Sequence, residues 1–228
     1  GRCMVIPAHA WTPWFGIFGS KSGFDSLEEC FGDLTRHVHA VETGLSSEPA
    51  MNWRVPDLDG VSIVSFSDAH SLPNMGRELT AFEGDLSYDG LARSLAAQAI
   101  AYTVEFFPQE GKYHHSGHRK CGVRYAPEEL EGVGRRCPAC GRPLTLGVLQ
   151  RVEELARRRV ETWADEGGFT RSDNGRPPFV MMVALRAIIA ESMGVGPKAK
   201  RVESAYFRLV GELGSELSVL MNAALEDI

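Results

Sequence analysis

Four residues in the middle of the sequence have the types and the spacing of a metal-binding knuckle. His118 and Cys121 are separated by two residues, and Cys137 and Cys140 repeat that gap after an interval of fifteen residues. Two ligand pairs of this kind let backbone turns place four nitrogen and sulfur donors tetrahedrally around a zinc ion. A closed set of four protein ligands is structural rather than catalytic, so we predict a structural zinc site.

The spacing leaves the fourth zinc ligand open. His114 and His115 precede His118 closely enough to compete with it for the metal. Residues 113–147 are rich in His, Cys, Gly and Arg and show little periodicity. A segment of this composition lacks a hydrophobic core of its own, and zinc would supply its folding energy.

A second candidate site lies where apolar runs end in polar residues. The run at residues 61–66 leads into Asp68 and His70, and the run at residues 4–6 leads into His9. The carboxyl ends of parallel strands are where α/β folds place their sites. One carboxylate and two imidazoles are a donor set that suits Zn, Mn or Fe. The competing interpretation is that both histidines are hydrogen-bonded core residues.

Three other patterns in the sequence could also bind a metal or a phosphate. Glu42 follows a third apolar pair and is a candidate either as a ligand or as a group that supports the ligands. His37 and His39 alternate, but they stand at the start of a strand rather than at its end. Residues 16–22 resemble a phosphate-binding loop with the wrong glycine spacing, so we reject nucleotide triphosphate binding.

The elements that would position these residues are of the α/β type. Residues 1–112 alternate short apolar strands with helices, which predicts parallel strand–helix units. Residues 148–228 carry apolar side chains at helical spacing and are predicted to be helical, with a loop through residues 167–178 and one helix over Phe179–Met193. The predicted organisation is therefore three segments: 1–112, 113–147 and 148–228.

Composition and charge narrow the class of protein. The 228 residues are 43% hydrophobic and 24% charged, which are ordinary globular proportions. No apolar run reaches the ~18 residues of a membrane span, and the tight cysteine pair favours metal binding in a reducing cytoplasm. The net charge is −6, but residues 112–160 contain 11 Lys and Arg against 5 Asp and Glu. This basic segment predicts contact with phosphates.

Nine short motifs occur together and in order, at residues 7–16, 42–47, 67–70, 76–78, 105–108, 111–114, 117–121, 137–141 and 147–149. Through them the chain resembles the endonuclease Q family over roughly residues 4–225. That family joins a polymerase-and-histidinol-phosphatase (PHP) domain, a distorted (β/α)7 barrel, to a zinc domain and a helical tail. The resemblance implies that residues 1–112 are the C-terminal half of the barrel, followed by the zinc-binding segment and the helical region.

The resemblance also implies a function. The family are DNA repair endonucleases that cut the phosphodiester on the 5′ side of deaminated bases (hypoxanthine, uracil) or abasic sites. His9, Asp68 and His70 match ligands of the family's catalytic metals, which we expect to be Zn, Mn, Fe or Mg. Glu42 matches a strand-end position near the metals that is not usually a ligand. The expected DNA contacts are Arg77, Lys112, Tyr113, His114, Arg119 and Lys120, with Trp14 and Phe15 either stacking on bases or buried in the barrel core.

One departure from the family affects this interpretation. A PHP domain opens with a His-x-His strand and later supplies a carboxylate, a histidine and a glutamate, and none of these precedes His9. We therefore expect a chain truncated at its N-terminus that holds only part of the catalytic metal site. The alternatives are a non-catalytic, zinc-braced DNA-binding fragment and a PHP phosphatase acting on a small phosphoester. The zinc segment and the basic segment argue against the phosphatase.

Overall fold

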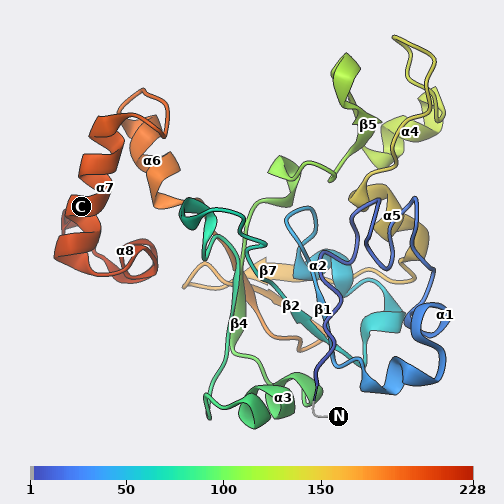
Figure 1. Cartoon of the computed structure of the whole chain (residues 1–228), viewed down its shortest axis with the longest axis horizontal. Coiled ribbons are helices and arrows are strands. Elements are labelled where there is room, and N and C mark those ends of the chain that lie inside the picture. Colours follow the sequence, from blue (N-terminus) through green and yellow to red (C-terminus); the bar gives the residue numbers. More distant parts are fainter. Residues whose placement is uncertain (1–2, 228) are drawn as a thin grey trace. The chain divides into compact units, whose positions relative to one another are not determined.

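The computed structural model describes residues 3–227 and divides into two compact units (Figure 1). The first unit extends to Met181 and the second begins at Met182. Within the described stretch, no helix combines the length and the apolar character needed to cross a membrane.

The first unit contains three small sheets, one of two parallel strands, one of five mixed strands and one antiparallel pair. Strands β1 and β2 are parallel, with Ala40 opposite Ser62, which confirms the predicted parallel pairing. In the five-stranded sheet, ordered β3-β4-β9-β8-β7, β4 runs antiparallel to β3 and parallel to β9. The full PHP barrel stays a prediction. The strands are β1 (Ala40–Glu42), β2 (Ser62–Val64), β3 (Leu79–Ala81), β4 (Tyr102–Glu105), β5 (Ser116–His118), β6 (Val123–Tyr125), β7 (Thr162–Ala164), β8 (Thr170–Ser172) and β9 (Phe179–Met181).

Helix α5 (Val148–Leu155) packs against the main core of the first unit. Val148 and Val152 are fully buried in one apolar cluster with Trp53 and Phe179. Burying a side chain of this size contributes roughly 1.5–3 kcal/mol. The other helices of this unit are α1 (Leu27–Phe31), α2 (Pro49–Asn52), α3 (Tyr88–Ala96) and α4 (Pro127–Val133).

The prediction of a helical region beginning at residue 148, interrupted only by a loop, missed the three strands β7, β8 and β9. Phe179–Met181 pairs with β4 instead of opening the helix predicted over Phe179–Met193. Periodicity cannot assign so short an apolar run, because a buried strand and a buried helical turn give the same pattern. The division into three segments stays a prediction.

The second unit is a set of three helices, α6 (Leu185–Ser192), α7 (Lys200–Leu213) and α8 (Glu216–Asn222). Its core contains Val202 and Leu209, which the helical spacing predicted, together with Val219, which it did not. Glu216 links the helices, because its two carboxylate oxygens accept from the Leu185 backbone N–H at 2.8 Å and from the Tyr206 hydroxyl at 2.9 Å.

We expect Arg176→Leu to lower the free energy of unfolding by about 2–3 kcal/mol, because it removes the hydrogen bonds of a charged donor, including the one to the carbonyl of the buried Val61. The largely buried Arg176 guanidinium donates to the carbonyls of Leu58, Asp59 and Val61 at 3.0–3.1 Å. Urea denaturation measures the change. Arg157→Leu at an exposed position is the control, with an expected change within about 0.5 kcal/mol. Equal losses in the two variants would contradict this account.

Candidate functional site

The four residues of the predicted zinc knuckle come together. The ligand atoms of His118, Cys121, Cys137 and Cys140 all lie within 4.8 Å of one another, and Cys140 Sγ is 3.4 Å from His118 Nδ1. This donor set fits zinc, whose bonds of about 2.0–2.3 Å place tetrahedral ligand atoms about 3.5–4 Å apart. Among residues 3–227 this is the one group of three or more His, Cys, Asp or Glu side chains that gathers in this way. His118 is therefore the histidine that joins the cysteines.

The knuckle itself favours a thiolate at Cys137. Burial opposes ionisation of this thiol, but hydrogen bonds from the backbone N–H groups of Ala139 and Cys140 outweigh it and lower its pKa. The local core is small, with Leu130, Cys137 and Leu144 as its buried members. Zinc binding would replace the missing apolar core of this segment.

The prediction of a DNA contact by His114 was wrong for this structure. The side chain is only 3% exposed, and its Nδ1 lies 2.9 Å from the carbonyl oxygen of Ser46. Burial lowers the pKa of His114. The residue therefore anchors the start of the zinc segment to the neighbouring loop, and it has no surface to offer to a strand of DNA.

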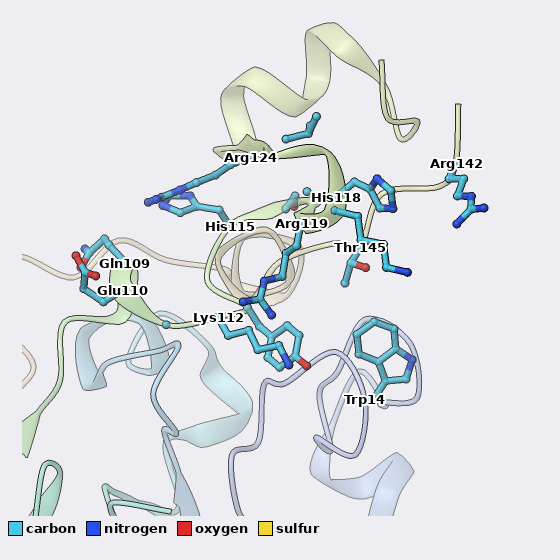
Figure 2. Close-up of a pocket in the computed structure, with 16 residues that line it drawn as sticks. Trp14, Gln109, Glu110, Lys112, His115, His118, Arg119, Arg124, Arg142 and Thr145 are labelled. Atoms are coloured by element: carbon cyan, nitrogen blue, oxygen red, sulfur yellow. The ribbon is translucent and has the colours of Figure 1, made fainter. Parts of the chain in front are cut away.

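A cavity of about 520 Å³ lies beside the zinc knuckle. Figure 2 shows Lys112, Arg119 and Trp14 around it, with Arg124 and His115 on another part of its wall. The Lys112 ammonium stands 4.8 Å from the centre of the Tyr113 ring. Five cations line this basic cavity: Lys112, Arg119, Lys120, Arg124 and Arg142.

Four of the six predicted DNA contacts line the basic cavity, namely Lys112, Tyr113, Arg119 and Lys120. Sequence reasoning missed Arg124 and Arg142, although both belong to the basic segment and stand between or just after the zinc ligands.

Trp14 and Phe15, near the start of the chain, are surface residues. Trp14 is 43% exposed and lines the basic cavity, with its ring 6.1 Å from the ring of Tyr113. Phe15 is 90% exposed. The alternative that these two side chains are barrel core is therefore wrong.

The strand-end residues surround a second cavity, of about 350 Å³. Glu42 at the end of β1 and Asp68 after β2 both line it, together with Ile6, Ala8 and Phe66. Glu42 accepts a short hydrogen bond from the backbone N–H of His9. Burial raises the pKa of Glu42, the His9 N–H opposes that effect, and the charge of Asp68 adds to it. The structure thus brings His9, Glu42 and Asp68 to neighbouring positions at one edge.

The predicted metal ligands do not close into one set. The His70 side chain is 86% exposed, and its Nδ1 lies 2.8 Å from the Asp68 carbonyl and 4.0 Å from the Asp68 carboxylate. In the described chain, the donor atoms of His9, Asp68 and His70 do not gather as those of the zinc knuckle do. The donor types suit a divalent metal, but their arrangement in this structure leaves the set open.

Two of these predicted ligands have unusual backbone conformations. The φ angles of His9 and Asp68 are +35° and +44°, values that few residues other than glycine adopt. Gly44 supports the His9 turn, since a Cβ added there would lie 2.8–2.9 Å from the Cα and Cβ of His9. Backbone strain of this kind costs of order 1–3 kcal/mol per residue and is concentrated at functional sites.

Arg77 lies near this second cavity rather than near the basic one. Its Nε donates to the carbonyl oxygen of Ser67 at 2.9 Å, directly before Asp68. The next residue, Glu78, is a buried acid that sequence reasoning did not select, and Glu105 at the end of β4 is another. The signal for Glu105 was present in the sequence as a carboxylate at the end of an apolar strand.

Comparisons with known proteins show what this chain is similar to. Residues 184–228 match a sequence family described as the MJ0043 C-terminal domain. The protein MJ0043 of Methanocaldococcus jannaschii is 29% identical over 96% of this chain and 27% of its own length. YqxK of Bacillus subtilis is 30% identical over 99% of this chain and 52% of its own length.

The chain resembles endonuclease Q in three dimensions. The crystal structure of PfuEndoQ from Pyrococcus furiosus, a lesion-specific endonuclease, matches 98% of this chain with a TM-score of 0.81 and 29% identity. An endonuclease Q in complex with a 27-mer duplex that has an abasic lesion at the active site matches equally well, at 28% identity. The chain spans 54% of each of these solved proteins.

We expect zinc removal to abolish the basic cavity. Half of the residues that line it lie between Gly117 and Thr145, in the segment that the knuckle holds together. Treatment with a chelator, or Cys137→Ser, should therefore weaken binding to duplex DNA at least tenfold, measured by fluorescence anisotropy. Adding zinc back should restore the affinity of the chelated protein but not that of the variant. Unchanged DNA affinity after verified zinc loss would contradict this coupling.

The buried acids predict an unusual dependence of stability on pH. Burial, reinforced by the charge of Glu105, raises the pKa of Glu78, while Glu42 adds to the shift and Arg77 opposes it. A group whose pKa is raised in the folded state binds a proton there that the unfolded chain releases, so stability falls as pH rises above the ordinary carboxyl range of about 4.3.

Glu78→Gln should therefore stabilise the protein most at the alkaline end of the range. The amide replaces the neutral carboxyl without its ionisation, so the slope of stability against pH should become shallower between about pH 6 and 8. Thermal unfolding at a series of pH values measures this change. Glu83→Gln, at an exposed position, should leave the slope unchanged. Parallel profiles for wild type and Glu78→Gln would refute the assignment.

Proposed function

We propose that this chain is part of a DNA repair endonuclease that hydrolyses the phosphodiester 5′ to deaminated bases (hypoxanthine, uracil) or abasic sites. The observation that carries the proposal is the match of 98% of the chain to a lesion-specific endonuclease, and to such an enzyme bound to duplex DNA with an abasic lesion. The sequence motifs at both candidate sites point to the same family.

The basic cavity is the proposed DNA grip. Its five cations would neutralise backbone phosphates, which are the main source of affinity for DNA. Trp14 and Tyr113 stand on its wall and offer aromatic faces to a nucleotide turned out of the stack. A small phosphoester would need no such surface, so the cavity favours a nuclease over a phosphatase.

The second cavity is the proposed hydrolytic site. His9, Asp68 and His70 are the proposed metal ligands and catalytic residues, and Glu42 supports the His9 turn through its hydrogen bond. Divalent metal ions, when bound, supply a water of lowered pKa and neutralise charge on the phosphate. Arg77, through the part of its guanidinium not bonded to Ser67, is a proposed phosphate contact.

One observation favours a second function, a zinc-braced DNA-binding module without hydrolysis. The zinc knuckle and the basic cavity are complete in this structure, whereas the donors of His9, Asp68 and His70 are not gathered in the described residues. In this alternative, the chain binds DNA and does not cut it.

Incubation of the full chain with an inosine-containing duplex and Mn²⁺ distinguishes the two functions. We expect a nick on the 5′ side of the inosine, and we expect Asp68→Ala to reduce its rate at least 100-fold by removing the proposed metal-binding carboxylate. Asp33→Ala, at an exposed position away from both cavities, is the control. DNA binding without nicking by the wild-type chain would favour the module, and equal nicking by Asp68→Ala would rule out this site.

The DNA grip is tested by the salt dependence of binding. Replacing Arg119 and Lys120 together by glutamine should make the slope of log K against log salt shallower by about 1.8, since each phosphate contact contributes about 0.9. Arg36→Gln with Arg93→Gln removes the same charge from exposed positions outside the cavity and should leave the slope unchanged. Equal effects of the two pairs would show that the cavity has no special role.

A further inference from the structure

A single buried carboxyl group connects three strands beneath the second cavity. Glu105, the last residue of β4, is fully buried, and its Oε1 accepts hydrogen bonds from the hydroxyls of Ser65 and Thr103. The Thr43 hydroxyl lies 2.6 Å from the Ser65 hydroxyl and 3.4 Å from Glu105 Oε2. Thr43 directly follows β1 and Ser65 directly follows β2, so one side chain joins the ends of both parallel strands to β4.

These strand ends carry the residues that line the cavity. Glu42 directly precedes Thr43, and Asp68 follows Ser65 by three residues. Strand β3 holds Ser65 from another side, because the Thr80 hydroxyl accepts from the Ser65 N–H at 2.9 Å and donates to the Ser65 carbonyl at 3.0 Å. A movement of Ser65 relative to Thr43 would therefore change the separation of Glu42 and Asp68.

Core packing does not explain an acid at this position. An apolar side chain of the same volume would fill the space without the cost of removing a carboxyl group from water, which is several kcal/mol for an ionised group. Burial accordingly raises the pKa of Glu105, the Ser65 and Thr103 hydroxyls oppose the shift, and the nearby charge of Glu48 adds to it. Only a polar acceptor can hydrogen-bond the hydroxyl groups at the strand ends, and an apolar side chain cannot.

We propose that Glu105 is a positioning residue that fixes the separation of the β1 and β2 ends, and with it the placement of Glu42 and Asp68 around the second cavity. It contacts neither the cavity nor the substrate and acts through Thr43 and Ser65. The inference rests on the proposed function only in treating the second cavity as the hydrolytic site.

Amide hydrogen exchange on the full zinc-loaded chain tests this role without reference to DNA or to cleavage. Glu105→Leu keeps the volume and removes the acceptor, so protection of peptides spanning residues 40–46 and 62–70 should fall at least tenfold. Glu105→Gln keeps an oxygen acceptor and should retain protection within about threefold of wild type. Glu78→Leu is the control, because Glu78 accepts from the backbone N–H of Phe106 and from neither strand-end hydroxyl.

The outcomes separate positioning from general stability. Loss of protection confined to the two peptides, with helix α5 unchanged and rescue by glutamine, supports the proposal. A uniform loss that includes α5, or no loss, overturns it. If Glu105→Leu does not fold, Ser65→Ala removes the hydroxyl that bonds both Glu105 and Thr43, and unchanged protection of residues 40–46 in that variant overturns the proposal as well.

The pH profile is a readout that packing alone would not produce. Because the pKa of Glu105 is raised in the closed state, an opening that admits water to it becomes easier as pH rises. Protection of the two peptides, corrected for intrinsic exchange, should fall between about pH 6 and 8 in wild type and stay level in Glu105→Gln. Identical pH profiles for wild type and Glu105→Gln would show that ionisation of Glu105 does not control the opening of the strand ends. The exchange measurements test the role of Glu105 independently of whether the chain nicks DNA.

Discussion

Strands of three residues form too few backbone hydrogen bonds to hold their carboxyl ends in place, and the first unit has to meet this constraint by other means. Strands β1 and β2 share only three residue pairs. Their ladder is continued by the Thr43 N–H, which donates to the Val64 carbonyl at 2.9 Å, and then by hydroxyl groups that converge on Glu105. Asp68, beyond the end of β2, and His9, whose N–H is bonded to Glu42 at the end of β1, have strained backbones, and the acids Glu78 and Glu105 have raised pKa values. Strained backbones and buried acids at one edge of a sheet lower the stability of the fold, and such a cost is typical of a functional site.

The zinc segment meets a different constraint. It has a core of three buried residues, too small to fix the course of a long, glycine-rich stretch of chain. The four ligands fix the turns at both ends, and β5 and β6 then present Arg119, Lys120 and Arg124 to the basic cavity. Helix α5 connects this segment to the main core through Val148 and Val152. The shape of the basic cavity therefore depends on the metal site beside it.

Features held by residues close together in the sequence were predictable, and features that depend on contacts between distant segments were not. The zinc ligands could be found from sequence because each pair is held by a local turn, and β1 and β2 because each lies in a short, largely apolar run. The Glu105 network could not, because it depends on β4 pairing with β3 and β9, which no local pattern specifies. For the same reason Phe179–Met181 was expected in a helix. The position of the His70 ring depends on a loop whose course is set by Arg77 and the Ser67 carbonyl, ten residues apart in sequence.

Both cavities belong to the first unit, and in the proposed function one DNA strand contacts both of them. A crystal structure of this chain with zinc, Mn²⁺ and a short duplex containing an abasic site tests this requirement most directly. We predict backbone phosphates within hydrogen-bonding distance of Arg119 and Lys120, and a phosphate on the 5′ side of the lesion at the cavity between Glu42 and Asp68. DNA bound on another face, or held in the basic cavity with no phosphate near Asp68, would contradict the assignment of the strand ends to hydrolysis.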